Sequence, residues 1–161
     1  MVTAYIGLGS NLEDPRCQLT QAIASLKSLT GCQCLAVSRL YRSKPMGPQD
    51  QPDYVNAVMA METDLPALAL LDELQVIEQQ QGRVRGDEQW GPRTLDLDLL
   101  LYSDQIIDLP RLKIPHPGLH ERSFVLYPLY EIAPTLQVPG HGELVELLQH
   151  VENDLEVISD E

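Results

Sequence analysis

Two aspartates separated by one residue, Asp96 and Asp98, have the type and spacing that most readily suggest chemistry in this chain. Leucines at positions 95, 97, 99 and 101 alternate with them, which predicts a strand with one apolar face and both acids on the other. Side chains two residues apart on a strand start roughly 6.5–7 Å from each other, close enough to converge on one cation or a close pair of cations. Carboxylates of this kind suit Mg²⁺, which usually also binds the phosphates of a substrate.

The alternative interpretation of the two acids is a structural ion pair with Arg83, Arg85 or Arg93. The distribution of charge favours a ligand. The net charge is −13, which argues against a nucleic-acid partner, yet six of the eleven Lys and Arg residues lie in the range 83–122. An acidic chain that gathers its positive charge in one segment is suited to a small polyanion.

The length of 161 residues predicts a single domain spanning 1–161, with an acidic tail from about residue 152 that is a solvated face or a frayed end. The sequence has no long apolar run and no signal-type N-terminus, so we expect a cytoplasmic protein without a membrane partner. Three cysteines, Cys17, Cys32 and Cys34, match no metal or redox spacing and are expected to be free thiols.

The elements that must position the acids can be predicted from periodicity and turn signals. We expect strands at 2–6, 32–42, 54–63 and 95–101, helices between Asp14 and Gly31 and between Pro66 and Gly82, a short strand at 106–107, a helix at 123–131 that breaks at Pro128, and a last helix at 143–150. This order predicts an α+β, ferredoxin-like (split βαβ) fold, with an antiparallel sheet, helices packed on one face and additional C-terminal elements.

The face of the sheet that the helices leave uncovered is the expected ligand face. Tyr54 and Asn56 should emerge there together with the two acids, and a ring-and-amide pair can hold a flat heterocycle. Two polar loops, 43–52 and 83–92, are candidate lids. Glu78 lies near the C-terminal end of its helix, where the dipole does not favour a carboxylate, so it needs an arginine or ligand partner. No P-loop motif is present, so side chains would have to bind any phosphate.

Several motifs together resemble the 6-hydroxymethyl-7,8-dihydropterin pyrophosphokinases of folate biosynthesis. They are Gly91 to Leu100, Glu78 with Gly82 to Arg85, Tyr41 to Ser43, Gly47 to Pro52, Tyr54-x-Asn56, and Pro115-His116-Pro117 with Arg122 to Phe124. The resemblance covers roughly residues 2–138 in consistent order. One departure is Gln89, where members of this family usually carry a basic residue.

The resemblance implies Mg²⁺-dependent transfer of pyrophosphate from ATP to the hydroxymethyl group of the pterin, giving AMP and the pterin diphosphate. It also implies that Asp96 and Asp98 hold two Mg²⁺ ions and act in catalysis with Arg83 and Arg93. The implied ATP-binding residues are Glu78, Arg85, Arg93, Arg111, His116 and Arg122. The implied pterin-binding residues are Ser43, Pro45, Met46, Tyr54, Asn56, Trp90, Asp96 and Phe124.

Two other classes of protein remain open on the residues alone. Another metal-dependent nucleotidyltransferase or phosphohydrolase of ferredoxin-like fold would also use two such acids, and a non-enzymatic ligand-binding module would need neither metal nor ATP. In each case we expect a monomer whose partners are small molecules.

Overall fold

A six-stranded antiparallel sheet is the centre of the structure, a computed structural model that describes residues 1–11, 14–44, 53–81 and 95–158. The strands lie in the order β10-β3-β4-β1-β5, and β2 also pairs with β4, beside β3. Their bounds are Val2–Ser10 for β1, Cys32–Val37 for β2, Tyr41–Ser43 for β3, Tyr54–Thr63 for β4, Asp96–Tyr102 for β5 and Glu156–Val157 for β10. The predicted antiparallel sheet is therefore confirmed.

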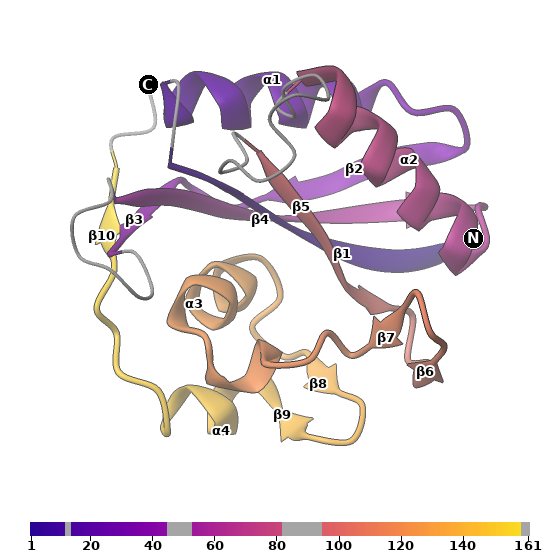
Figure 1. Ribbon diagram of the computed structural model, residues 1–161. Coiled ribbons are helices and arrows are strands. Elements are labelled where there is room, and N and C mark those ends of the chain that lie inside the picture. Colours follow the sequence, from indigo (N-terminus) through magenta and orange to yellow (C-terminus); the bar gives the residue numbers. More distant parts are fainter. Residues whose placement is uncertain (12–13, 45–52, 82–94, 159–161) are drawn as a thin grey trace.

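Helices lie on both sides of this sheet (Figure 1). One face is covered by α1 (Pro15–Lys27) and α2 (Ala67–Gln81), as predicted. The other carries α3 (Ser123–Ile132), α4 (Leu144–Leu148), the short helix η2 (Leu119–Glu121) and two small hairpins, β6 (Ile107–Asp108) with β7 (Lys113–Ile114) and β8 (Gln137–Val138) with β9 (Gly142–Glu143). The expected ligand face is thus partly covered by the C-terminal elements.

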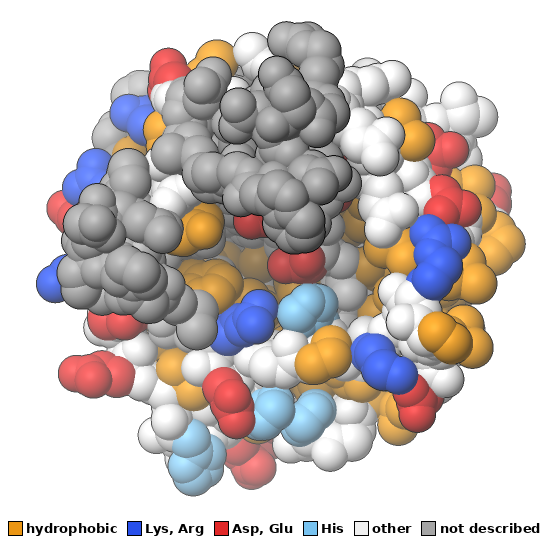
Figure 2. Space-filling view, in the orientation of Figure 1, with side chains coloured by type: hydrophobic (Ala, Val, Ile, Leu, Met, Phe, Trp, Pro, Cys, Tyr) orange, Lys and Arg blue, Asp and Glu red, His pale blue; other side chains and the backbone are white. Residues whose placement is uncertain are grey.

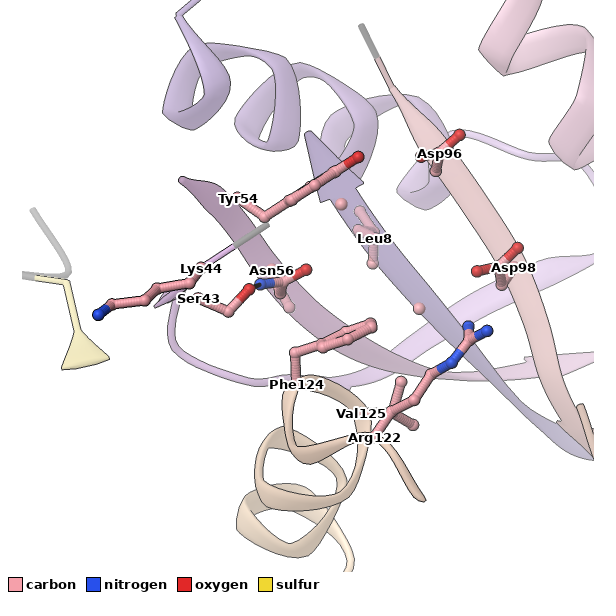
Figure 3. A pocket seen from close by; sticks show the side chains of 13 residues that line it. Leu8, Ser43, Lys44, Tyr54, Asn56, Asp96, Asp98, Arg122, Phe124 and Val125 are labelled. Atoms are coloured by element: carbon pink, nitrogen blue, oxygen red, sulfur yellow. Dashed lines mark hydrogen bonds between the residues drawn. The ribbon is translucent and has the colours of Figure 1, made fainter. Parts of the chain in front are cut away.

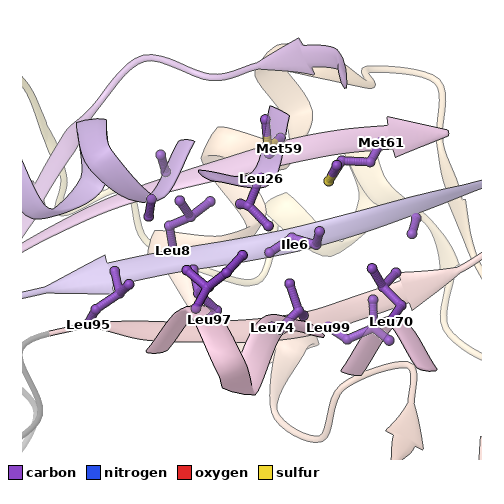
Figure 4. Close-up of a cluster of buried hydrophobic side chains, with 14 of the residues drawn as sticks. Ile6, Leu8, Leu26, Met59, Met61, Leu70, Leu74, Leu95, Leu97 and Leu99 are labelled. Carbon is purple, nitrogen blue, oxygen red and sulfur yellow. The ribbon is translucent and has the colours of Figure 1, made fainter. Parts of the chain in front are cut away.

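Because side chains alternate along β4, the two faces of this strand pack against different layers. Val55, Ala57, Met59 and Met61 belong to the main core beneath α1 and α2 (Figure 4). Val58 points the other way, into a second cluster with residues of α3. Both faces of the central sheet therefore carry buried clusters over much of their area.

The predicted alternation in β5 holds for its first half and is wrong beyond Leu99. Leu95, Leu97 and Leu99 lie in the main core, whereas Leu101 lies in the second cluster. A bulge is the reason, because Ile6 pairs with Leu99 and Tyr5 with Leu101, leaving Leu100 as an extra residue. The carbonyl of Leu100 accepts a hydrogen bond from the backbone of His116 at 3.0 Å, so the bulge also holds the 115–117 segment against the strand.

Two of the predicted strands have different bounds. The first strand does not end at residue 6 but continues to Ser10, because β1 pairs with β4 on one side and β5 on the other along its length. The predicted strand at 32–42 is divided into β2 and β3. Between them, Ser38 accepts a hydrogen bond from the Val58 amide on its side chain and donates its own amide to the Val58 carbonyl, which turns the chain.

The C-terminal part differs most from the prediction. The helix α3 does not break at Pro128 but continues to Ile132. Pro128 is buried, and this burial offsets the loss of the backbone hydrogen bond that proline cannot donate. The last helix is shorter than predicted. The acidic tail is not frayed up to residue 158: β10 pairs with β3, Glu156 forms an ion pair with Arg42 at 3.0 Å, and Ile158 packs into the main core. Among the described helices, none has the length and apolar character to cross a membrane.

Candidate functional site

A pocket of about 180 Å³ opens on the face of the sheet that carries α3. Strands β1, β4 and β5 contribute its floor, and the N-terminal end of α3 contributes one side (Figure 3). In the space-filling view, acidic, basic and histidine side chains lie close together around a hollow (Figure 2). This mixture of charges matches neither a simple apolar groove nor an anion site made only of cations.

The two aspartates lie side by side along one edge of the pocket (Figure 3). Their predicted position on one face of the strand is confirmed, since both line the pocket. They face Gly9 and Gly7 of β1 across the ladder, and glycines there keep the floor in front of them free of side chains. The Asp98 side chain is 48% exposed, and its Oδ1 lies 3.9 Å from Nε2 of His116.

Arg122 supplies positive charge opposite the acids. Its guanidinium carbon lies 5.9 Å from the ring centroid of Phe124, a cation–π contact that holds it over the pocket. Gly118 makes room for it: a Cβ there would be 3.1 Å from Nε of Arg122, and the residue has φ of 86°, in the left-handed region. The sequence analysis did not select Gly118, although glycine just before a short helix is the signal that could have identified it.

The far end of the pocket has a polar pair on the floor and aromatic walls. The Asn56 Nδ2 group donates a hydrogen bond to the buried Ser43 Oγ at 2.8 Å. This bond turns the Asn56 carbonyl oxygen away from Ser43, over Gly9, whose added Cβ would lie 3.3 Å from it. Tyr54 and Phe124 stand on either side (Figure 3). Burial, followed by the negative charge of Asp96, raises the pKa of Tyr54, so its hydroxyl stays protonated.

The four predicted ATP-binding residues that the structure describes have different surroundings. Arg122 lines the pocket and His116 lies at its rim beside Asp98, whereas Arg111 is outside the lining residues and forms an ion pair with Asp72 on α2 at 2.5 Å. Glu78 is also outside the pocket lining. It is only 6% exposed, and its Oε2 accepts a hydrogen bond of 2.7 Å from the amide of Leu97.

Several predicted site residues lie outside the described part of the chain. They are Pro45, Met46, Arg83, Arg85, Trp90 and Arg93. Lys44 lines the pocket without having been predicted, and its position directly after Ser43 was the available signal.

The residues present fit a small, hard divalent cation. Within the described ranges, no group of three or more His, Cys, Asp or Glu side chains is arranged to hold a metal ion. Mg²⁺ nevertheless needs only one or two carboxylates when substrate phosphates complete its shell, and Asp96 and Asp98 offer such a pair at the pocket edge. This donor set would suit a metal ion shared with substrate phosphates better than a closed structural metal site.

Solved structures with a similar fold contain a domain of this kind within a longer chain. The Plasmodium falciparum HPPK-DHPS wild type with SDX-DHP aligns with a TM-score of 0.69, 13% identity and coverage of 93% of this chain and 43% of that one. An HPPK-DHPS in complex with substrates aligns with a TM-score of 0.73 and 12% identity over 93% of this chain and 45% of that one. This chain thus spans less than half of each, and the likeness shows the fold.

Sequence comparison gives the family. A 2-amino-4-hydroxy-6-hydroxymethyldihydropteridine pyrophosphokinase from Pseudomonas aeruginosa is 54% identical over 89% of this chain and 88% of its own length. The protein of the same name from Haemophilus influenzae is 54% identical over 92% of each. The family model described as 7,8-dihydro-6-hydroxymethylpterin-pyrophosphokinase (HPPK) matches residues 5–134. With the pocket and the paired acids in place, we conclude that the chain belongs to the HPPK family.

Proposed function

We propose that this chain transfers pyrophosphate from ATP to 6-hydroxymethyl-7,8-dihydropterin, giving AMP and the pterin diphosphate in folate biosynthesis. Membership of a family of ATP-dependent diphosphotransferases supports this activity. One observation carries the proposal: a single pocket joins an amide between aromatic rings to a pair of carboxylates. The first arrangement suits a flat heterocycle and the second suits metal-bound phosphates, so the two reactants can meet inside one cavity.

The end of the pocket with Asn56 is the proposed pterin site. Tyr54 and Phe124 offer ring faces for stacking, and the oriented Asn56 amide offers an acceptor for the amino and ring N–H groups of a pterin. Ser43 contributes by holding that amide in one orientation. Pro45, Met46 and Trp90 are proposed to complete this site.

The end of the pocket with Asp96 and Asp98 is the proposed nucleotide end. These two carboxylates would hold two Mg²⁺ ions, which neutralise phosphate charge when bound. Arg122 and His116 lie close enough to the acids to contact the same phosphates, and guanidinium groups bind phosphate through paired hydrogen bonds. Arg83, Arg85, Arg93 and Arg111 are proposed to contact the remaining phosphates.

The chemical contribution of these residues is alignment and charge neutralisation. Pyrophosphoryl transfer needs little covalent help from a protein, so holding the acceptor oxygen in line with the β-phosphorus of ATP is the main task. The Asn56 amide on β4 and the Asp96 carboxylate on β5 provide that alignment from the two strands that flank β1. We propose a cytoplasmic monomer with no nucleic-acid partner, which the net charge of −13 supports.

The proposed reaction is tested by its products. The protein is incubated with ATP, Mg²⁺ and 6-hydroxymethyl-7,8-dihydropterin, and the products are identified by mass. We expect AMP and the pterin diphosphate in equal amounts. Release of pyrophosphate or inorganic phosphate without a modified pterin would indicate a nucleotidyltransferase or phosphohydrolase instead. Pterin binding without any turnover would indicate a binding module.

A further inference from the structure

Glu78 places a buried carboxylate against the backbone between the two aspartates. The residue belongs to α2, on the face of the sheet opposite the α3 side, and is 6% exposed. Its Oε2 lies 2.7 Å from the amide nitrogen of Leu97. Leu97 separates Asp96 from Asp98, so this hydrogen bond holds the central residue of the Asp-x-Asp sequence.

The position of β5 in the sheet explains what this bond replaces. Among the described strands, β5 ends the order and pairs with β1 alone. Successive N–H groups of an antiparallel strand point alternately toward the partner strand and away from it. The Leu97 N–H, being bonded to Glu78, is one that points away from β1, so no ladder partner holds it. A buried amide without an acceptor is unfavourable, and a carboxylate acceptor gives a stronger bond than a neutral one.

Resting on the function proposed above, we propose that Glu78 is a positioning residue of the metal site. By fixing the outer edge of β5 at Leu97, it sets the twist of the strand and with it the separation and direction of the Asp96 and Asp98 carboxylates. Among the described residues, Glu78 is outside the pocket lining, and its hydrogen bond to the Leu97 amide connects it to both carboxylates through the backbone of the strand. Substituting it should therefore weaken metal binding through a change in backbone geometry.

Two conservative variants separate the hydrogen bond from the charge. E78Q keeps the side-chain length and an oxygen acceptor for Leu97 but removes the charge. E78D keeps the charge but is one methylene shorter, so it withdraws the acceptor. The control is E73D, the same change at an exposed glutamate of the same helix.

The hydrogen bond between the Leu97 amide and residue 78 is monitored by the chemical shift and hydrogen exchange of that amide in ¹⁵N NMR spectra. In the wild-type protein and in E78Q, we expect a Leu97 amide shifted downfield and protected from hydrogen exchange. In E78D, the shift should move upfield and the protection should fall, while E73D matches the wild type. An unchanged Leu97 amide in E78D would overturn the proposal at its first step.

Metal binding is read from Mn²⁺ titrations followed by electron paramagnetic resonance, with α,β-methylene-ATP present. We expect E78D to bind Mn²⁺ about tenfold more weakly than the wild type, which is the usual scale for loss of a group that supports metal ligands. E78Q should stay within about threefold, and E73D should not change. Equal affinity in E78D and the wild type, or a larger loss in E78Q than in E78D, would overturn the positioning role. Absence of Mn²⁺ binding by the wild-type protein would instead overturn the proposed function.

Discussion

At the scale of single residues, the two aspartates have the same type but different neighbours. Asp98 lies beside His116 at 3.9 Å, whereas Asp96 lies near Tyr54, whose hydroxyl pKa is raised by burial and then by the negative charge of Asp96. Asp96 is therefore closer to the proposed pterin end and Asp98 to His116. Under the proposed function, the two acids would share the metal ions but lie next to different reactants.

Replacing either acid by its amide tests the metal site. We expect D96N and D98N each to lower the rate of AMP formation by at least about 100-fold, the scale on which preorganised charge contributes to such reactions. Because D96N also removes charge beside Tyr54, it should additionally raise the KM for the pterin. Steady-state kinetics with product analysis by mass measures both effects. Near-normal turnover in both variants would exclude these acids as metal ligands.

The hydrogen bond between Ser43 and Asn56 tests the pterin end. In S43A the Asn56 amide loses the group that orients it, so the KM for the pterin should rise about fivefold, corresponding to about 1 kcal/mol for one hydrogen bond. The KM for ATP should not change. S43T, which keeps the hydroxyl, is the control and should behave like the wild type. An equal rise in both KM values would contradict a role confined to the pterin.

At the scale of elements, Glu131 connects α3 to the sheet. Its carboxylate accepts hydrogen bonds from the Tyr41 hydroxyl at the start of β3 and from the Arg39 amide, and it forms an ion pair with the Arg39 side chain at 3.3 Å. The opposite ends of the two elements carry Phe124 and Ser43, both in the pocket. The network therefore sets the distance between the Phe124 wall and the Ser43 part of the floor at the proposed pterin end.

This network gives a predicted loss of stability at alkaline pH. Burial and then the hydrogen bond to Glu131 raise the pKa of Tyr41 to about 12, above its unfolded value of about 10. The neutral hydroxyl stabilises the fold fully below about pH 10, and this contribution is lost as the pH rises toward about 12. Urea unfolding at several pH values should show a smaller alkaline decrease for Y41F than for the wild type. Y130F, at an exposed position of α3, is the control and should leave the decrease unchanged.

The close approach of Gly118 to the Arg122 side chain leads to a second prediction at the scale of elements. G118A adds a Cβ 3.1 Å from Nε of Arg122 in a residue with φ of 86°. We expect a loss of about 1 kcal/mol in the free energy of unfolding from the strained backbone and a raised KM for ATP from the displaced guanidinium. G140A is the matched control, because Gly140 has φ of 78° and its added Cβ meets only Ile106, at 3.9 Å. A raised KM in G140A of the same size would remove the Arg122 explanation.

Sequence periodicity predicted the elements that depend on local signals. The bounds of β4 and the capped start of α1 at Asp14 agree with prediction, because alternation and N-cap chemistry are encoded within a few residues. The break at Ser38 and the bulge at Leu100 were not predicted, since each depends on a strand distant in the sequence. The continuation of α3 through Pro128 similarly depends on burial against other elements.

At the scale of the whole molecule, the C-terminal segment closes an edge of the sheet beside the pocket. Its acidic composition predicted a solvated tail, but the pairing of β10 with β3 and the burial of Ile158 are non-local and cannot be recognised from composition. The candidate site likewise has one part that the local sequence predicts and one part that depends on distant contacts. The shared face of Asp96 and Asp98 followed from alternation, whereas the contact between Glu78 and the Leu97 amide depends on how α2 packs across the sheet.

The contribution of this segment can be measured through Ile158. I158A removes a side chain that is 7% exposed and packs into the main core, so the free energy of unfolding should fall by about 2 kcal/mol in urea titrations. V157A, at a neighbouring side chain that is 45% exposed, should change it by less than about 0.5 kcal/mol. Similar values for the two variants would mean that the segment is not anchored through the core.

The alternation of acids and leucines along β5 also disfavours incorrect pairing of this strand with β1. A slip of one residue relative to β1 would turn Asp96 and Asp98 inward among the leucines and expose Leu97 to water. Both halves of that exchange are unfavourable, since ionised groups would lose hydration while apolar surface gained it. The two aspartates proposed to hold the metal ions thus also disfavour the alignment of β5 that is shifted by one residue.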